Sequence, residues 1–250
     1  MPNINVIRRV IFGGGMAVAP SPPLSNLVIW LDSNVPSSLF VNSDGTGGTP
    51  ATGGTVGRWK DISGNNYYVS QTIASQRPLY VTNSINSKPA LVFDGIDDIL
   101  SSPTFTWNRP ETIYIVFKRN RDTQIETVFD GFGLNNMRLF MGFRFATEIQ
   151  LFAQNYGAVT SLSTGSYSII RCVFKASAQG SSITINNEAP VVDAIGNMNA
   201  DGSGLTLGSY AGGGTYSLVN ICEVIGYNSI LTAADNTTIM SYLNTKYAIY

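Results

Sequence analysis

Short runs of alternating apolar and polar residues constrain the fold of this 250-residue chain more than any other feature. Gly, Asn, Ser and Asp fill the gaps between these runs, and clear examples of the runs lie at 112–118, 127–130, 137–145, 149–152, 168–174, 182–185 and 218–227. Successive side chains of a strand point to opposite faces, so each run offers one face to a core. Strands that recur every 8–12 residues or so are typical of sandwiches. The pattern predicts an all-β, antiparallel two-sheet jelly-roll sandwich.

Composition restricts the function of this fold. The chain contains no histidine, and its 15 basic and 16 acidic residues leave a net charge of -1. Catalysis that depends on an imidazole is therefore excluded. No field of one sign is present to hold a nucleic-acid backbone or an anionic membrane, and no run approaches the roughly 18 apolar residues of a membrane span. We expect a non-enzymatic protein that binds neither nucleic acid nor membrane.

The N-terminal residues 1–25 differ from the remainder. Gly13 to Gly15 and the prolines between Pro20 and Pro23 interrupt regular structure, so we expect an anchoring arm with a hinge, followed by one domain over 26–250. The same breaks argue against a cleaved signal peptide. The apolar residues and the arginine pair of the arm are predicted to contact a neighbouring subunit: Ile4, Val6, Ile7, Arg8, Arg9, Ile11 and Phe12.

One helix is predicted at the C-terminal end. Thr232 and Asp235 resemble a capping box, with Asp in the usual place of Glu. Ile239, Leu243 and Tyr247 follow at helical spacing, which predicts about four turns packed on the sandwich.

The two cysteines, Cys172 and Cys222, both lie in apolar runs. Two buried free thiols and a single disulfide are both compatible with this placement. A structural zinc site needs about four Cys or His ligands and is excluded.

Five motifs occur in a fixed order along the chain: LVIWLD at 27–32, WKDISGN at 59–65, FDGIDD at 93–98, EVIGYN at 223–228 and YLNTKY at 242–247. Together they resemble the laminin-G-like jelly-roll domains of the concanavalin A-like lectin/glucanase superfamily, in their bacterial and phage form. The match spans 27 to 247. The resemblance implies two facing antiparallel sheets, one of them concave.

Most motif residues are interpreted as structural. Trp30 and Trp59 are large enough to fill a core or its rim, and 61–65 reads as a turn. The alternative for the acids is calcium, because Asp94, Asp97 and Asp98 lie within five residues. Their spacing is not that of a loop chelate, and strand alternation would point Asp97 and Asp98 to opposite faces. We therefore expect no cofactor, with calcium as the alternative.

Glycosidase activity is not expected. Retaining glycosidases need two carboxylates about 5–5.5 Å apart, which strand alternation would supply as acid-x-acid, and the nearest approach is Glu148 followed by Gln150. Glycan binding needs only exposed rings and convergent polar groups. The candidates for glycan contact are Tyr67, Trp107, Asn108, Tyr156 and Tyr210.

The sequence thus favours a non-enzymatic accessory protein of a virus particle, a phage capsid decoration, stabilising or projecting protein attached by its arm. Its partners would be capsid or tail proteins and sister subunits in a homo-oligomer, and its location the virion. The phage context comes from the resemblance alone. The alternative is a carbohydrate-binding adhesin, on a tail fibre or secreted to the extracellular space, that engages cell-surface glycans.

Overall fold

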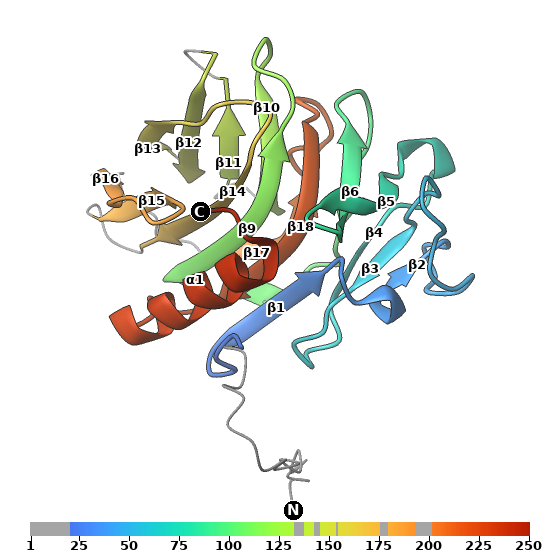
Figure 1. Ribbon diagram of the computed structural model, residues 1–250, viewed down its shortest axis with the longest axis horizontal. Coiled ribbons are helices and arrows are strands. Elements are labelled where there is room, and N and C mark those ends of the chain that lie inside the picture. The colour runs from blue at the N-terminus through green and yellow to red at the C-terminus, as the bar shows by residue number, and fades with distance from the viewer. Residues whose placement is uncertain (1–20, 133–137, 143–145, 154, 176–179, 194–201) are drawn as a thin grey trace, which may run out of the picture.

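The computed structural model describes residues 21–132, 138–142, 146–153, 155–175, 180–193 and 202–250. Over these residues, two antiparallel sheets face each other and helix α1 (Ala233–Tyr247) packs on the outer face of one of them (Figure 1). The predicted all-β sandwich with one C-terminal helix is confirmed. The predicted arm contacts at 4–12 lie outside the described residues.

Sheet A lies next to the helix and is built around the long strand β18 (Leu218–Tyr227). Its order is β16-β15-β14-β9-β18-β6-β5, and β1 (Leu27–Asp32) pairs with the part of β18 that β6 leaves unpaired. The remaining strands are β5 (Leu79–Ile85), β6 (Lys88–Asp94), β9 (Glu111–Arg119), β14 (Tyr167–Phe174), β15 (Ser181–Ile185) and β16 (Val191–Asp193).

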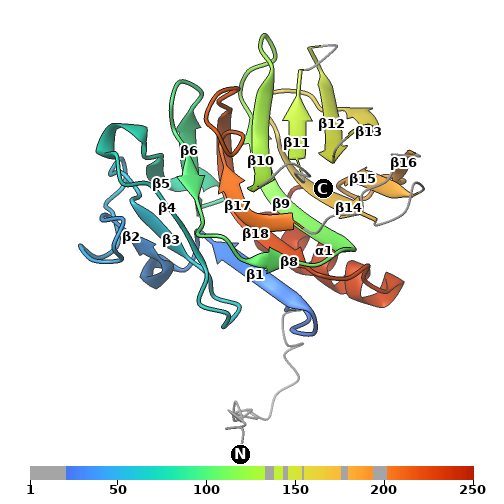
Figure 2. The same ribbon diagram turned by 180° about the vertical axis from the view of Figure 1, so that it is seen from behind.

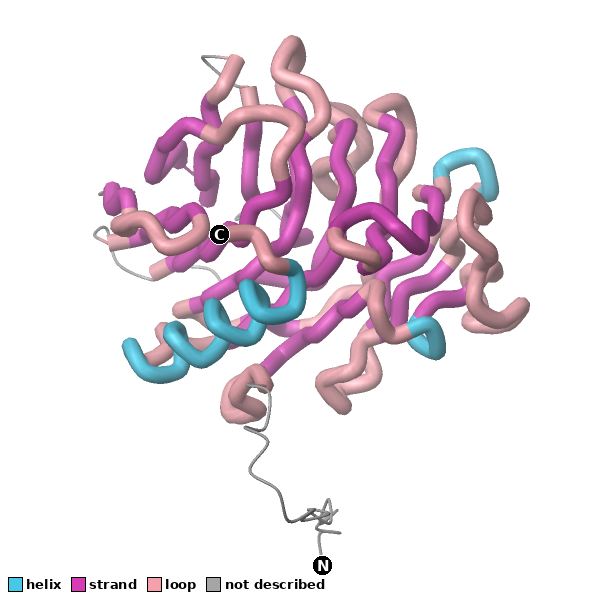
Figure 3. The backbone as a smooth tube through the Cα atoms, in the orientation of Figure 1, coloured by secondary structure: helices cyan, strands magenta, loops and turns pink. Residues whose placement is uncertain are grey.

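Sheet B forms the other layer, which lies nearer the viewer in Figure 2. Its order is β13-β12-β11-β10-β17-β7-β4-β3-β2, with β8 paired to β17. The strands are β2 (Leu39–Phe40), β3 (Arg58–Lys60), β4 (Tyr68–Ser70), β7 (Leu100–Ser101), β8 (Thr106–Trp107), β10 (Glu126–Phe132), β11 (Arg138–Met141), β12 (Glu148–Ala153), β13 (Asn155–Ser161) and β17 (Gly202–Leu207). Two short 3-10 helices, Pro36–Ser38 and Ala74–Gln76, complete the described elements (Figure 3).

Sheet A is covered on both faces, which explains the nearly continuous apolar sequence of β9. Ile113, Ile115 and Phe117 point into the core between the sheets, whereas Tyr114 and Val116 point toward α1. A strand that is buried on both faces needs apolar side chains at odd and even positions alike. The sandwich therefore holds two apolar clusters, a large one between the sheets and a smaller one under the helix.

Helix α1 begins at its predicted cap and has about the predicted four turns. The Thr232 hydroxyl accepts a hydrogen bond from the Asp235 backbone N–H at 3.1 Å, which satisfies one of the unpaired N–H groups of the first turn. Ile239, Leu243 and Tyr247 are buried against sheet A.

The two cysteines are buried and free. Cys172 on β14 belongs to the core between the sheets, and Cys222 on β18 to the cluster under the helix, with β9 between the two strands. Of the two alternatives that the sequence leaves open, the structure has two buried free thiols.

Residues 21–25 contact the sandwich. Pro22 is buried, and the Pro23 carbonyl accepts a hydrogen bond from the Tyr227 hydroxyl at 3.0 Å. The end of the predicted arm thus lies against β18. Among the described residues, no helix has the length and apolar character needed to cross a membrane.

Candidate functional site

The first and last motifs meet in a buried hydrogen-bond network centred on Glu223 of β18. Its Oε1 accepts from the Trp30 indole N–H at 2.7 Å and from the Tyr242 hydroxyl at 2.8 Å. Its Oε2 accepts from Lys246 Nζ at 2.7 Å and from the Tyr247 hydroxyl at 2.8 Å. Four donors saturate a carboxylate that is fully buried. This satisfaction is what burial of a charged group requires.

Asp32, at the end of β1, extends this network. Lys246 Nζ lies 2.5 Å from its Oδ2, and its Oδ1 accepts from the Asn34 N–H at 2.9 Å. Asp32 and Glu223 face each other across the β1–β18 pair. Burial raises the pKa of Glu223, the charge of Asp32 raises it further, and Lys246 opposes both. The motif acids therefore tie α1 to sheet A.

The second motif also has a structural role. Asp61 Oδ1 accepts the Trp30 and Ser63 backbone N–H groups at 2.7 and 2.9 Å. Asn65 donates to the carbonyls of Leu27 and Val28, both at 2.9 Å. The predicted turn at 61–65 is confirmed, and it holds β1 in place.

The third motif forms a closed acidic turn. Carboxylate oxygens of Asp94, Asp97 and Asp98 lie within 4.8 Å of one another. The expectation that Asp97 and Asp98 point to opposite faces is wrong, because the turn at Gly95 (φ 70°) interrupts the strand and its alternation. Asp94 Oδ1 accepts from three backbone N–H groups, at 2.8 Å from Ile96, 3.2 Å from Asp97 and 3.4 Å from Asp98. Calcium binding at this turn stays a prediction.

Asp98 is the buried member of this turn. Its Oδ2 accepts from the Asp94 N–H at 2.9 Å. Burial raises the pKa of Asp98 to about 7, and the neighbouring charges of Asp94 and Asp97 add to the increase. The turn therefore keeps Asp98 protonated at mildly acidic pH, where a free aspartate is ionised.

Trp107 does not have the exposure that glycan stacking requires. Its side chain is fully buried, because β8 directs it into the core, where its indole N–H donates to the Tyr227 carbonyl at 3.3 Å. Tyr67 is half-buried and stacks on Phe105, with 4.2 Å between the ring centroids. The centroids of the Phe105 and Trp107 rings lie 5.8 Å apart. Asn108, next along the chain, is the exposed one among the three glycan candidates at this end. Trp107 is therefore a core residue, which corrects the sequence prediction.

The other two predicted glycan residues lie elsewhere. Tyr210 is 36% exposed in the loop after β17, with the Arg138 guanidinium 5.5 Å from its ring. Tyr156 belongs to β13, and its side chain lies outside the described structure. The structure brings Tyr67 and Trp107 together within a core stack and places Tyr210 apart from them. The five candidates do not form one site.

A groove that the sequence did not reveal lies between α1 and the β14–β15 hairpin. Its volume is about 280 Å³, near the lower end of ligand pockets. Amide and hydroxyl side chains make up most of its wall, which also holds one cation, one carboxylate, a methionine and an exposed ring. The lining residues are Arg171, Thr184, Asn186, Asn187, Glu188, Asn236, Thr237, Met240, Ser241 and Tyr250.

Hydrogen bonds hold the floor of this groove. Arg171 Nη2 donates to the Thr184 hydroxyl at 2.9 Å, and the Tyr114 hydroxyl donates to Asn236 Oδ1. Burial raises the pKa of Tyr114, and Arg171 opposes that shift. Arg171 Nε is buried and has no hydrogen-bond partner among the described residues. The floor thus holds a guanidinium that is fixed by Thr184, with its Nε buried beneath the groove surface.

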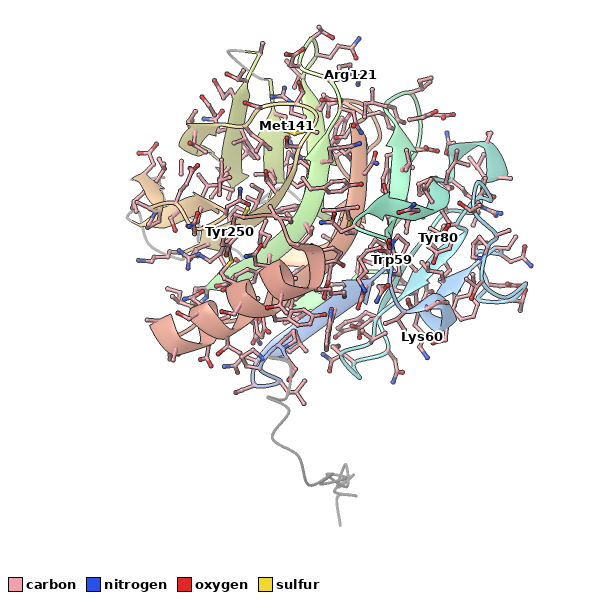
Figure 4. All side chains as sticks on the ribbon, in the orientation of Figure 1. Trp59, Lys60, Tyr80, Arg121, Met141 and Tyr250 are labelled. Atoms are coloured by element: carbon pink, nitrogen blue, oxygen red, sulfur yellow. The ribbon has the colours of Figure 1, made fainter. Side chains whose placement is uncertain are left out.

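Tyr250 forms one side of the groove because the Asn244 side chain binds the backbone that follows α1. Asn244 Oδ1 accepts the N–H groups of Ile249 and Tyr250 at 2.9 and 3.0 Å, and its Nδ2 donates to the Tyr250 carbonyl at 2.6 Å. Tyr250 remains 46% exposed, and Figure 4 labels its side chain near α1. The sequence signal was an Asn in the last helical turn before an aromatic, a pattern too common to identify a site.

No protein-family model and no curated protein sequence matches this chain. Among solved structures, Trypanosoma rangeli sialidase is 13% identical, with a TM-score of 0.58 over 95% of this chain and 35% of the sialidase chain. The binding domain of botulinum neurotoxin serotype D is 11% identical, with a TM-score of 0.58 over 87% of this chain and 51% of that one.

Domain 4 of AbnA, an extracellular arabinanase of Geobacillus stearothermophilus, was solved with arabinotriose. It is 14% identical, with a TM-score of 0.55 over 86% of this chain and 98% of that domain. The chain spans about a third of the sialidase chains it matches. These likenesses show the β-sandwich fold, in agreement with a jelly roll.

Proposed function

We propose that this protein is a non-enzymatic carbohydrate-binding module whose ligand lies in the groove between α1 and the β14–β15 hairpin. The groove itself is the observation that supports the proposal. Seven of its ten lining residues carry amides or hydroxyls, Tyr250 among them, and these groups exchange hydrogen bonds with sugar hydroxyls in both directions. Tyr250 and Met240 supply the apolar surface on which a sugar ring rests.

Binding is favoured over hydrolysis by the lining of the groove. Glu188 is the one carboxylate among its lining residues, and a glycosidase of the common types uses two. The complex of domain 4 of AbnA with arabinotriose supports the binding proposal, because the match covers 98% of that sugar-bound domain and 86% of this chain.

We further propose that the module acts on the surface of a virion, with the extracellular space as the alternative location. The motif resemblance to phage-type jelly rolls supports this location, and the low charge of 12% charged residues suits close packing of many copies. In this setting, residues 1–12 would attach the module to capsid or tail proteins or to sister subunits. The domain would then present its groove to a cell-surface glycan.

A glycan array with the full chain, followed by titration of the best ligand, tests the binding proposal. Tyr250→Ala should weaken binding about tenfold or more, because it removes the exposed ring of the groove. Tyr210→Ala is a matched control. It removes another partly exposed tyrosine, which lies in the loop after β17 of sheet B, away from the groove. Loss of binding in Tyr210→Ala together with unchanged binding in Tyr250→Ala would place the ligand elsewhere. An array without any bound glycan would reject the function.

A further inference from the structure

The network around Glu223 brings an amine and a carboxyl group into reacting distance. Lys246 Nζ lies 2.5 Å from Asp32 Oδ2. The side chains are only 12% and 6% exposed, and the two residues are 214 positions apart in the sequence. β1 and α1, which carry them, lie side by side in both ribbon views (Figures 1 and 2).

Glu223 contacts the same amine from the other side. Its Oε2 lies 2.7 Å from Lys246 Nζ, and its side chain is fully buried. Trp30, Tyr242 and Tyr247 each donate a hydrogen bond to it, so its carboxylate is held in one orientation. Asp32 is equally fixed, because the Asn34 N–H binds Oδ1 and leaves Oδ2 directed at the lysine.

We propose that Asp32 and Lys246 condense into an intramolecular isopeptide bond, with Glu223 as the proton carrier. The amine, the carboxyl group and the buried acid are arranged as this reaction requires, in a part of the protein from which water is largely excluded. The product links β1 covalently to α1 and closes a ring from residue 32 to residue 246.

The atoms of the reaction balance within the site. Glu223 accepts one proton from the Lys246 ammonium and passes it to Asp32, which leaves a neutral amine facing a neutral carboxyl group. The nitrogen lone pair forms the bond from Nζ to Cγ of Asp32, and the Asn34 N–H stabilises the charge that develops on Oδ1. The bond from Cγ to Oδ2 then breaks, and this oxygen departs with two former ammonium protons as one water molecule. Nothing is oxidised or reduced, and Glu223 ends as it began.

Two physical effects favour the condensation. Fixed reactants behave as if present at an effective concentration of about 10⁵–10⁸ M, which lowers the barrier to bond formation between the amine and the carboxyl group. The reaction also removes two charges from a buried site, where an ion pair recovers its desolvation cost only with ideal geometry. The raised pKa of Glu223 agrees with a carboxyl group that can hold a proton in transit.

Mass spectrometry of the purified full chain tests the proposal directly. Under denaturing conditions, the wild-type chain should be lighter than its sequence by one water molecule. Trypsin should release the peptide 10–58 joined to the peptide that begins at 176, with no cleavage after Lys246. The proposal would be overturned if the wild-type chain has the mass calculated from its sequence, without loss of water, and yields these two peptides separately. The contact would then be an ion pair only.

Three variants assign the roles. Lys246→Arg keeps the positive charge without the reactive amine and should have the linear mass. Asp32→Asn should still form the same amide, now with loss of ammonia in place of water. Glu223→Gln keeps the size of the side chain but cannot carry the proton, so we expect a folded and linear chain, with folding checked by its circular dichroism. Full crosslinking of Glu223→Gln would refute the role of Glu223 as proton carrier.

Discussion

The indole N–H groups of two core tryptophans provide a sensitive test of the packing. Trp59 on β3 and Trp107 on β8 are both fully buried. Trp107 Nε1 donates to the Tyr227 carbonyl at 3.3 Å, whereas Trp59 Nε1 has no hydrogen-bond partner among the described residues. Replacement of either ring by phenylalanine removes apolar volume, which costs about 1–2 kcal/mol. The two variants should nevertheless differ, because only one of the N–H groups is satisfied.

In the wild type, the unsatisfied N–H of Trp59 costs about 1–3 kcal/mol. Trp59→Phe removes this donor, and the gain offsets the loss of apolar volume. We expect a free energy of unfolding within about 1 kcal/mol of the wild type. Trp107→Phe also loses a hydrogen bond worth about 1 kcal/mol, so its destabilisation should reach about 2–3 kcal/mol. For a chain of this size, a difference of about 2 kcal/mol separates the melting temperatures by about 4–8 °C.

Denaturant and thermal melts of the two variants measure this difference. If Trp59→Phe is destabilised as much as Trp107→Phe, the Trp59 N–H has a partner in solution and the reasoning is refuted. Trp59→Ala provides the internal reference, with an expected cost of about 3–5 kcal/mol for a core ring. A cost below about 1 kcal/mol would instead place Trp59 at the surface.

Three further changes test other parts of the fold. Thr232→Ala should lower stability by about 1 kcal/mol, because the Asp235 N–H loses its cap; an unchanged melt would contradict that role, with exposed Thr245→Ala as the control. Gly226→Ala should cost about 1–3 kcal/mol, because a Cβ there would lie 2.3 Å from Trp107 Cζ2, and a neutral result would mean that the ring moves freely. Asp98, whose folded pKa is about 7, binds its proton more tightly in the folded than in the unfolded chain, so wild-type stability should fall between about pH 4 and pH 7. Asp98→Asn should reduce this fall. If the wild-type and Asp98→Asn curves of stability against pH stay parallel between about pH 4 and pH 7, the role of Asp98 is refuted.

The sequence predicted those elements whose burial pattern is local. The run at 218–227 became β18 with the predicted bounds, and the helix begins at the predicted cap because Thr232 and Asp235 interact within one turn. Of the run at 137–145, the structure places Arg138–Met141 in β11, while 137 and 143–145 lie outside the described residues. Its turn at Gly142 has a positive φ that alternation cannot reveal.

The candidate site was beyond the reach of the sequence because its parts meet only in the folded chain. Trp107 and Tyr210 were both predicted as exposed rings, yet β8 directs Trp107 into the core while the loop leaves Tyr210 partly exposed. Arg171 reads as an isolated charge in an apolar strand. Its neighbours across the groove, Thr237 and Met240, come from a helix more than sixty positions away.

The degree to which polar groups are satisfied separates structural residues from candidate binding residues in this chain. Glu223 stands in the fourth motif, and four donors from within the protein occupy its two oxygens. A group so occupied can bind nothing further without losing a bond it already has. Arg171 stands in no motif, yet its Nε has a donor without a partner beside an open groove. That N–H is buried, so the groups a ligand can reach are the amide and hydroxyl side chains of the groove wall and the exposed Tyr250. The motifs therefore account for the fold, and the groove outside them is where a ligand would gain most.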